Sequence, residues 1–101
     1  MKDPNYIERD SVFQKLSSMR QELSNLFTVR RIGVFGSVVK GEATTESDLD
    51  ILVEFDEPTF DHYMDLKFML EDNLKRSVDL VMADTLKPRI KSIIEHEVIY
   101  A

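Results

Sequence analysis

Short apolar segments alternate with longer stretches of helical periodicity in this chain, and this alternation limits the possible folds more than any other feature. Residues 31–35, 48–55 and 77–82 carry runs of branched and aromatic side chains that are too brief for helices, so they predict strands. Residues 11–27 and 60–74 instead place apolar side chains at helical spacing, which predicts two helices with one buried face each. The pattern therefore favours a small β-sheet flanked by helices, an α/β fold, or α+β if the sheet is mixed.

A last helix and a short terminal strand are expected near the C-terminus. Asp84 or Thr85 is the expected N-cap of that helix, because Asp and Thr side chains accept hydrogen bonds from the first free N–H groups. Pro88 fits the first turn, where its missing N–H removes no helical hydrogen bond. Residues 98–100, Val-Ile-Tyr, predict the strand. We expect residues 1–101 to form one domain, since half of this length rarely folds unaided.

Charge and composition exclude several classes of protein. With 13 basic and 19 acidic residues the net charge is −6, so the surface as a whole repels phosphate backbones and no direct nucleic acid binding is expected. The absence of cysteine excludes disulfides and thiolate metal sites, and two histidines are too few for a typical zinc site. No segment approaches the ~18 apolar residues of a membrane span, and residues 1–5 lack the apolar run of a secretory signal. We therefore expect a cytoplasmic protein with no membrane partner.

Three aspartates mark the starts of two predicted strands. Asp48 and Asp50 are two residues apart, so a strand would point both side chains to the same face, about 6.5–7 Å apart. Two ionised carboxylates at that distance repel one another unless a cation lies between them, and ligation by oxygen alone favours Mg²⁺ or Mn²⁺. Asp79 interrupts an apolar run, and it can join the pair if the two strands are neighbours. The three carboxylates predict a site for a divalent metal.

Gly36-Ser37 predicts a phosphate site beside these carboxylates. A strand that ends in Gly-Ser and turns into a short helix would expose backbone N–H groups and the Ser37 hydroxyl, which are groups that bind phosphate oxygens. Gly36 lets the backbone approach its neighbours closely, because it has no side chain. A phosphate site next to a carboxylate cluster indicates a metal–nucleoside triphosphate, with an attacking oxygen on one side and leaving pyrophosphate on the other.

The spacing of these residues resembles a known motif. Gly36-Ser37, then ten residues, then Asp48-Leu49-Asp50, with Asp79 later, resembles the motif of the polymerase β nucleotidyltransferase superfamily. Within that superfamily the chain is similar to the minimal nucleotidyltransferases, the MNT or MntA-like antitoxins that accompany HEPN proteins. The expected number of chance matches to this motif in a chain of this composition is roughly 0.002. The likeness covers roughly residues 30–100, and it includes further segments in family order: Phe35, Lys40-Gly41-Glu42-Ala43, residues 47–55, residues 78–81 and Leu86-Lys87-Pro88.

The resemblance implies a polymerase β-like fold and a role for each motif residue. It implies that Asp48 and Asp50 bind metal and that Asp79 completes the cluster and helps to deprotonate the acceptor hydroxyl. Gly36 and Ser37 would hold the triphosphate. The implied activity is Mg²⁺-dependent transfer of a nucleoside monophosphate, AMP from ATP, to a hydroxyl on a partner protein. The implied partner is a HEPN toxin, silenced by the modification, which would make this chain an antitoxin.

Two other hypotheses stay open at this stage. The chain is alternatively a non-catalytic antitoxin or binding module that neutralises its partner by occlusion, with the acidic cluster retained for metal binding or structure. A transferase that extends RNA or modifies a small molecule ranks lower, because the sequence shows neither a basic groove nor an acceptor domain. The chain also departs from the family at Lys75, where relatives often have a glycine that ends the helix, and at Val38-Val39, where many carry a basic or small polar residue.

Overall fold

The computed structural model describes residues 9–42, 44 and 47–101. The predicted strands and both predicted long helices are confirmed, with their ends shifted by at most two residues, whereas the last helix begins later than its expected cap implies. The elements are, in chain order, α1 (Arg9–Phe27), β1 (Val29–Phe35), the 3₁₀ turn η1 (Gly36–Val38), β2 (Leu49–Phe55), α2 (Phe60–Leu74), β3 (Val78–Met82), the 3₁₀ turn η2 (Ala83–Thr85), α3 (Pro88–Glu97) and β4 (Ile99–Tyr100).

The strands form one sheet in the order β3-β2-β1-β4. β1 is antiparallel to both β2 and β4, whereas β2 and β3 are parallel. Parallel neighbours need a long crossover connection, and α2 supplies it. The sheet is therefore mixed, which confirms the expected α+β form, and it brings the starts of β2 and β3 to the same edge.

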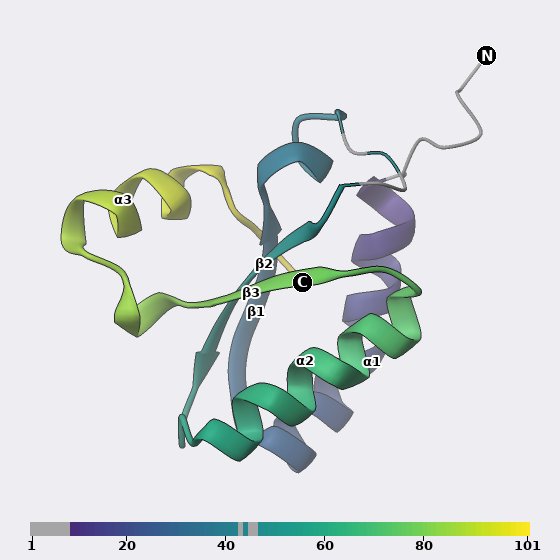
Figure 1. Cartoon of the computed structure of the whole chain (residues 1–101), viewed down its shortest axis with the longest axis vertical. Coiled ribbons are helices and arrows are strands. Elements are labelled where there is room, and N and C mark those ends of the chain that lie inside the picture. Colours follow the sequence, from purple (N-terminus) through teal and green to yellow (C-terminus); the bar gives the residue numbers. More distant parts are fainter. Residues whose placement is uncertain (1–8, 43, 45–46) are drawn as a thin grey trace.

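The hydrophobic core lies between one face of the sheet and the two long helices. α1 and α2 lie side by side against this face, while α3 lies apart from them (Figure 1). Alternate residues of the strands point into the core, as the period of two in a strand requires. The fully buried side chains of this layer include Leu16, Leu23, Ile32, Val34, Leu49, Ile51, Val53, Leu66 and Leu70.

The ends of α2 agree with the sequence prediction and show its causes. The helix begins after Thr59, whose Oγ1 accepts a hydrogen bond of 3.1 Å from the His62 N–H. It ends at Lys75, which takes the left-handed conformation with φ of 58°. This is the position where a glycine would adopt the same backbone without steric cost.

The expected cap of the last helix is wrong. Asp84 and Thr85 lie in η2, and the N-cap of α3 is Lys87, with no side-chain capping bond. Pro88 occupies the first turn as expected. The residues expected to cap α3 belong to the preceding 3₁₀ turn, and Asp84 instead lies 4.0 Å from the Lys91 ammonium.

No helix in the described part of the chain is long and apolar enough to span a membrane.

The C-terminal strand can pair closely with β1, at the edge of the sheet, because of one glycine. Gly33 on β1 faces Tyr100 on β4. A Cβ atom at Gly33 would lie 2.7 Å from Val98 Cγ2 and 2.8 Å from the Ile99 carbonyl oxygen, so any larger residue would push β4 away. The close approach of β4 to β1 places the end of α3 beside the Gly-Ser corner described next.

Candidate active site

Asp50 and Asp79 are brought together by the register of the parallel strands. Asp50 is the second residue of β2, Asp79 is the second residue of β3, and the two are direct partners in the sheet. Neighbouring strands lie about 4.8 Å apart, and paired residues point to the same face. That face is the one opposite α1 and α2, because Leu49, Ile51, Val78 and Leu80 point into the core.

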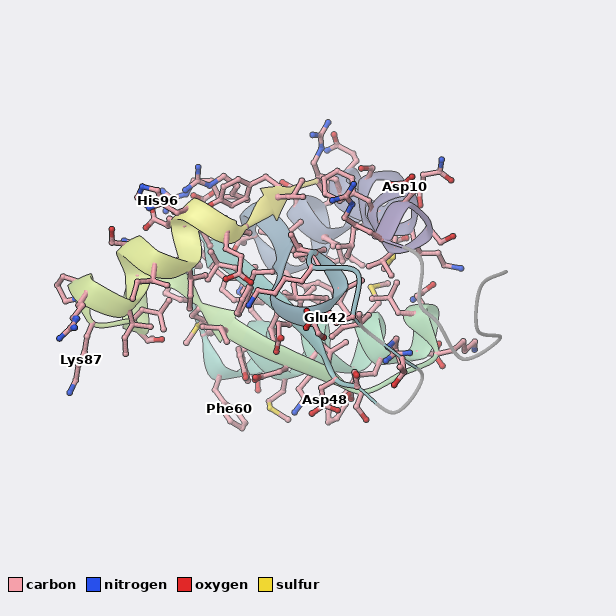
Figure 2. All side chains as sticks on the ribbon, turned by 90° about the horizontal axis from the view of Figure 1, so that it is seen from above. Asp10, Glu42, Asp48, Phe60, Lys87 and His96 are labelled. Carbon is pink, nitrogen blue, oxygen red and sulfur yellow. The ribbon has the colours of Figure 1, made fainter. Side chains whose placement is uncertain are left out.

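Asp48 lies just before β2 and is exposed at the surface of the molecule (Figure 2), next to Ser47, which Arg76 contacts. The Arg76 guanidinium donates from Nη2 to the carbonyl oxygens of Thr44 and Ser47, and so it ties the start of β3 to the residues before Asp48. Burial lowers the pKa of Arg76, while the charge of Asp48 opposes that effect. Nε of Arg76 is buried with no hydrogen-bond partner among the described residues. Thr44 and Ser47 are thus held by a residue that the sequence prediction did not single out.

Gly36 forms a sharp corner over the Asp50 carboxylate. Its φ is +76°, in the left-handed region that glycine adopts freely. A Cβ at this position would lie 2.1 Å from Asp50 Oδ2 and 3.2 Å from Asp50 Cβ, so there is no room for a side chain. The predicted short helix after the corner is the single 3₁₀ turn η1, and it contains Ser37, which is partly buried. Gly36, Ser37 and Asp50 therefore lie at one spot, as the sequence predicts.

Glu97 is a further acidic residue at this corner. The backbone N–H of Gly36 donates a hydrogen bond of 2.7 Å to Glu97 Oε1. The same oxygen lies 3.9 Å from the ammonium of Lys40, which follows η1. Sequence reasoning expected the Gly36 N–H to face a phosphate, whereas this structure pairs it with a carboxylate. Nothing in the sequence marks Glu97, because the contact joins residues 61 positions apart.

The electrostatics of the site centre on Asp50. Burial is the largest cause that raises the pKa of Asp50, followed by the negative charges of Asp79, Asp48 and Glu97. A hydrogen bond between the side chains of Asp50 and Asp79 acts in the same direction, since it requires a proton on one of them. The ionised form of Asp50 is therefore costly unless a positive charge lies beside it.

The residues fit a hard divalent cation in their chemistry. Within the described residues, no group of three or more metal-binding side chains is already arranged around a common point. Asp50 and Asp79 are adjacent, however, and a cation between them would remove the repulsion that raises the pKa of Asp50. Carboxylate oxygens are the ligands that Mg²⁺ and Mn²⁺ prefer. Asp48, Asp50 and Asp79 are therefore the residues that would hold such an ion.

The fold that brings this carboxylate pair beside a Gly-Ser corner is that of a nucleotidyltransferase. Residues 16–101 match the family model described as "Nucleotidyltransferase domain", and the chain belongs to this family. It is 46% identical over 86 residues to Protein adenylyltransferase MntA of Thermococcus cleftensis, a match that covers 84% of this chain and 87% of that protein. The resemblance to the minimal nucleotidyltransferases and the expectation of a transferase are thereby confirmed.

Solved structures share this fold. A structure of a "putative minimal nucleotidyltransferase" superposes with a TM-score of 0.79 at 34% identity, and the match covers 92% of this chain and 95% of that one. A complex of the tri-AMPylated HEPN toxin of Shewanella oneidensis with its MNT antitoxin gives a TM-score of 0.65 at 18% identity, covering 91% of this chain and 70% of that one. At that identity the second likeness shows the fold alone.

Proposed function

We propose that this chain transfers AMP from ATP to a hydroxyl group on a partner protein, a HEPN-type toxin, and that the transfer neutralises the toxin. The observation that carries the proposal is the register of the parallel strands, which pairs Asp50 with Asp79 beneath the Gly36 corner. Membership of the nucleotidyltransferase family supports the reaction. The name of the Thermococcus relative supports a protein as the acceptor, and the complex of a HEPN toxin with an MNT antitoxin supports the partner.

The residues of the site suit the proton transfer that the reaction needs. The acceptor oxygen forms a bond to the α-phosphorus of ATP, the bond from that phosphorus to the pyrophosphate breaks, and the acceptor proton must go to a base. We assign that proton to Asp79, which is more exposed than Asp50 and lies directly beside it. In this proposal Ser37 binds a phosphate oxygen, while Gly36 leaves the space that the Asp50 carboxylate fills.

Asp48, Asp50 and Asp79 would hold Mg²⁺, which would offset most of their negative charge and polarise the triphosphate. Without it, the net charge of −6 and the acidic cluster would repel ATP. The same negative charge supports docking on a basic partner surface, such as that of an RNA-binding toxin. Mg²⁺ dependence is therefore part of the proposal.

The test is intact-mass analysis of the partner toxin after incubation with this chain, Mg²⁺ and each of the four nucleoside triphosphates. We expect the toxin mass to rise by one or more adenylate groups with ATP, and the toxin's ribonuclease activity to fall in step. The double variant Asp48→Asn with Asp50→Asn should abolish transfer and neutralisation while still forming the complex. The control variant Asp61→Asn with Asp65→Asn removes two exposed charges from α2 and should behave as the wild type.

Two outcomes would replace the proposal. If the double variant neutralises the toxin without modifying it, occlusion is the mechanism and the acidic cluster serves another purpose. If label from α-labelled ATP appears on RNA or on a small molecule and not on the toxin, the acceptor is different. The first outcome is read from the reactions above, and the second from the same reactions run with α-labelled ATP.

A further inference from the structure

The contact of Glu97 with the Gly36 corner lies outside the motif that defines the family resemblance. We propose that Glu97 is a positioning residue of the active site, whose carboxylate holds the Gly-Ser corner in place by accepting the Gly36 N–H. The effect expected on the rate of AMP transfer rests on the proposed function. The effect expected on the Gly36 amide does not depend on that function.

The sheet register explains why Glu97 reaches the corner. β4 pairs with β1 through Gly33–Tyr100 and Val34–Ile99. Two steps further along the same antiparallel register, Glu97 stands opposite Gly36. The backbone of Glu97 is already helical there, because α3 ends at this residue. Its side chain therefore takes the place of the carbonyl group that a longer strand would have presented to the Gly36 N–H.

Two contacts fix both sides of the turn that follows β1. Glu97 Oε1 accepts from the Gly36 N–H at 2.7 Å, which is the short distance of a charge-assisted hydrogen bond. It also lies 3.9 Å from Lys40 Nζ, and the Lys40 N–H in turn donates to the Gly36 carbonyl at 3.2 Å. The carboxylate thus bridges Gly36, the first residue of η1, and Lys40, which lies two positions after the end of η1.

The corner needs such support because its conformation is demanding. Gly36 must keep a positive φ, and its Cα must stay against the Asp50 carboxylate. An unpaired N–H at this partly buried point would favour other conformations that reach water. By accepting that N–H, Glu97 holds Ser37 at a constant position relative to Asp50. A rigid arrangement of this kind is what a site for in-line transfer requires.

The test compares three variants. Glu97→Gln keeps an oxygen that can accept the Gly36 N–H but removes the charge, and Glu97→Ala removes both. Glu95→Ala is the matched control, because Glu95 is an exposed glutamate on the same helix whose ion pair is with Lys91. The first measurement is hydrogen exchange of the Gly36 amide by NMR, in the full chain without nucleotide. We expect Glu97→Ala to accelerate it about tenfold or more, and Glu97→Gln and Glu95→Ala to leave it within about threefold of the wild type.

The second measurement is the rate of AMP transfer to the partner. Glu97→Ala should lower kcat about tenfold, with a smaller change in KM for ATP, and Glu97→Gln should restore most of the rate. Unchanged Gly36 exchange in Glu97→Ala would overturn the proposal, and so would a Glu97→Gln variant as slow as Glu97→Ala, since the charge would then be the cause. If the wild type transfers no AMP, the proposed function fails, while the exchange measurement still decides the role of Glu97.

Discussion

Replacement of Gly36 by alanine tests the corner of the site most directly, because the structure separates its two effects. The first effect is backbone strain. At φ of +76° a residue with a Cβ costs about 1–2 kcal/mol. The second effect is a collision, since the new Cβ would lie 2.1 Å from Asp50 Oδ2 and 2.9 Å from Asp50 Cγ. The whole Asp50 side chain, and not only its tip, would have to rotate away.

The two effects have different consequences. Strain of about 1–2 kcal/mol should lower the melting temperature by roughly 4–16 °C in a domain of this size. Displacement of the Asp50 carboxylate by about 1 Å should lower the rate of AMP transfer about 100-fold. Thermal unfolding followed by circular dichroism measures the first, and the rate of adenylate incorporation into the partner measures the second, at a temperature where the variant stays folded.

Gly41→Ala is the control for strain alone. Gly41 has φ of +74°, nearly that of Gly36, and it is exposed. We expect a similar loss of melting temperature and a transfer rate within about threefold of the wild type. If Gly36→Ala loses no more activity than Gly41→Ala, the carboxylate does not depend on the space at Gly36, and the reasoning about this corner is refuted.

Three further predictions concern Asp50, Arg76 and Lys75. Because the folded state raises the pKa of Asp50 above the ordinary 3.8, it binds that proton more tightly than the unfolded chain, so its stability falls as pH rises from 3.8 through the raised pKa. Asp50→Asn should therefore have a higher melting temperature than the wild type at pH 7 in EDTA, and this difference should vanish below pH 3.8. Added Mg²⁺ should stabilise the wild type more than the variant. A lower melting temperature of the variant at pH 7 would contradict this reasoning. Arg76→Gln should lower the rate of AMP transfer about tenfold, because it removes the hydrogen bonds to the Thr44 and Ser47 carbonyl oxygens beside Asp48. Lys75→Gln is the control for loss of a nearby positive charge. Lys75→Gly should raise stability by about 1 kcal/mol, measured by urea unfolding, because it removes the strain of a left-handed lysine at the end of α2; no gain would show that the lysine side chain compensates.

The sequence by itself determined the local elements and most residues of the candidate site. Periodicity located both long helices and the strands because each pattern follows from a repeat within a few residues. Thr59 and Lys75 end α2 where expected, since capping acts over three or four residues. Asp48 and Asp50 were found for the same reason, as neighbours within one segment. The misplaced cap at Asp84 marks the limit of such rules, because a 3₁₀ turn competed for the same residues.

Only the tertiary structure decided which distant residues meet at the site. The position of Asp79 beside Asp50 depends on the parallel pairing of β3 with β2. The sequence alone did not show whether these two strands are neighbours. Glu97 and Arg76 reach the site through the register of β4 against β1 and through the turn after α2, across 61 and 29 positions of chain. In a chain with 32% charged residues, nothing local distinguishes a carboxylate or guanidinium that contacts the site from one that only faces solvent. Strand register makes that distinction, because it is set by the packing of the whole sheet.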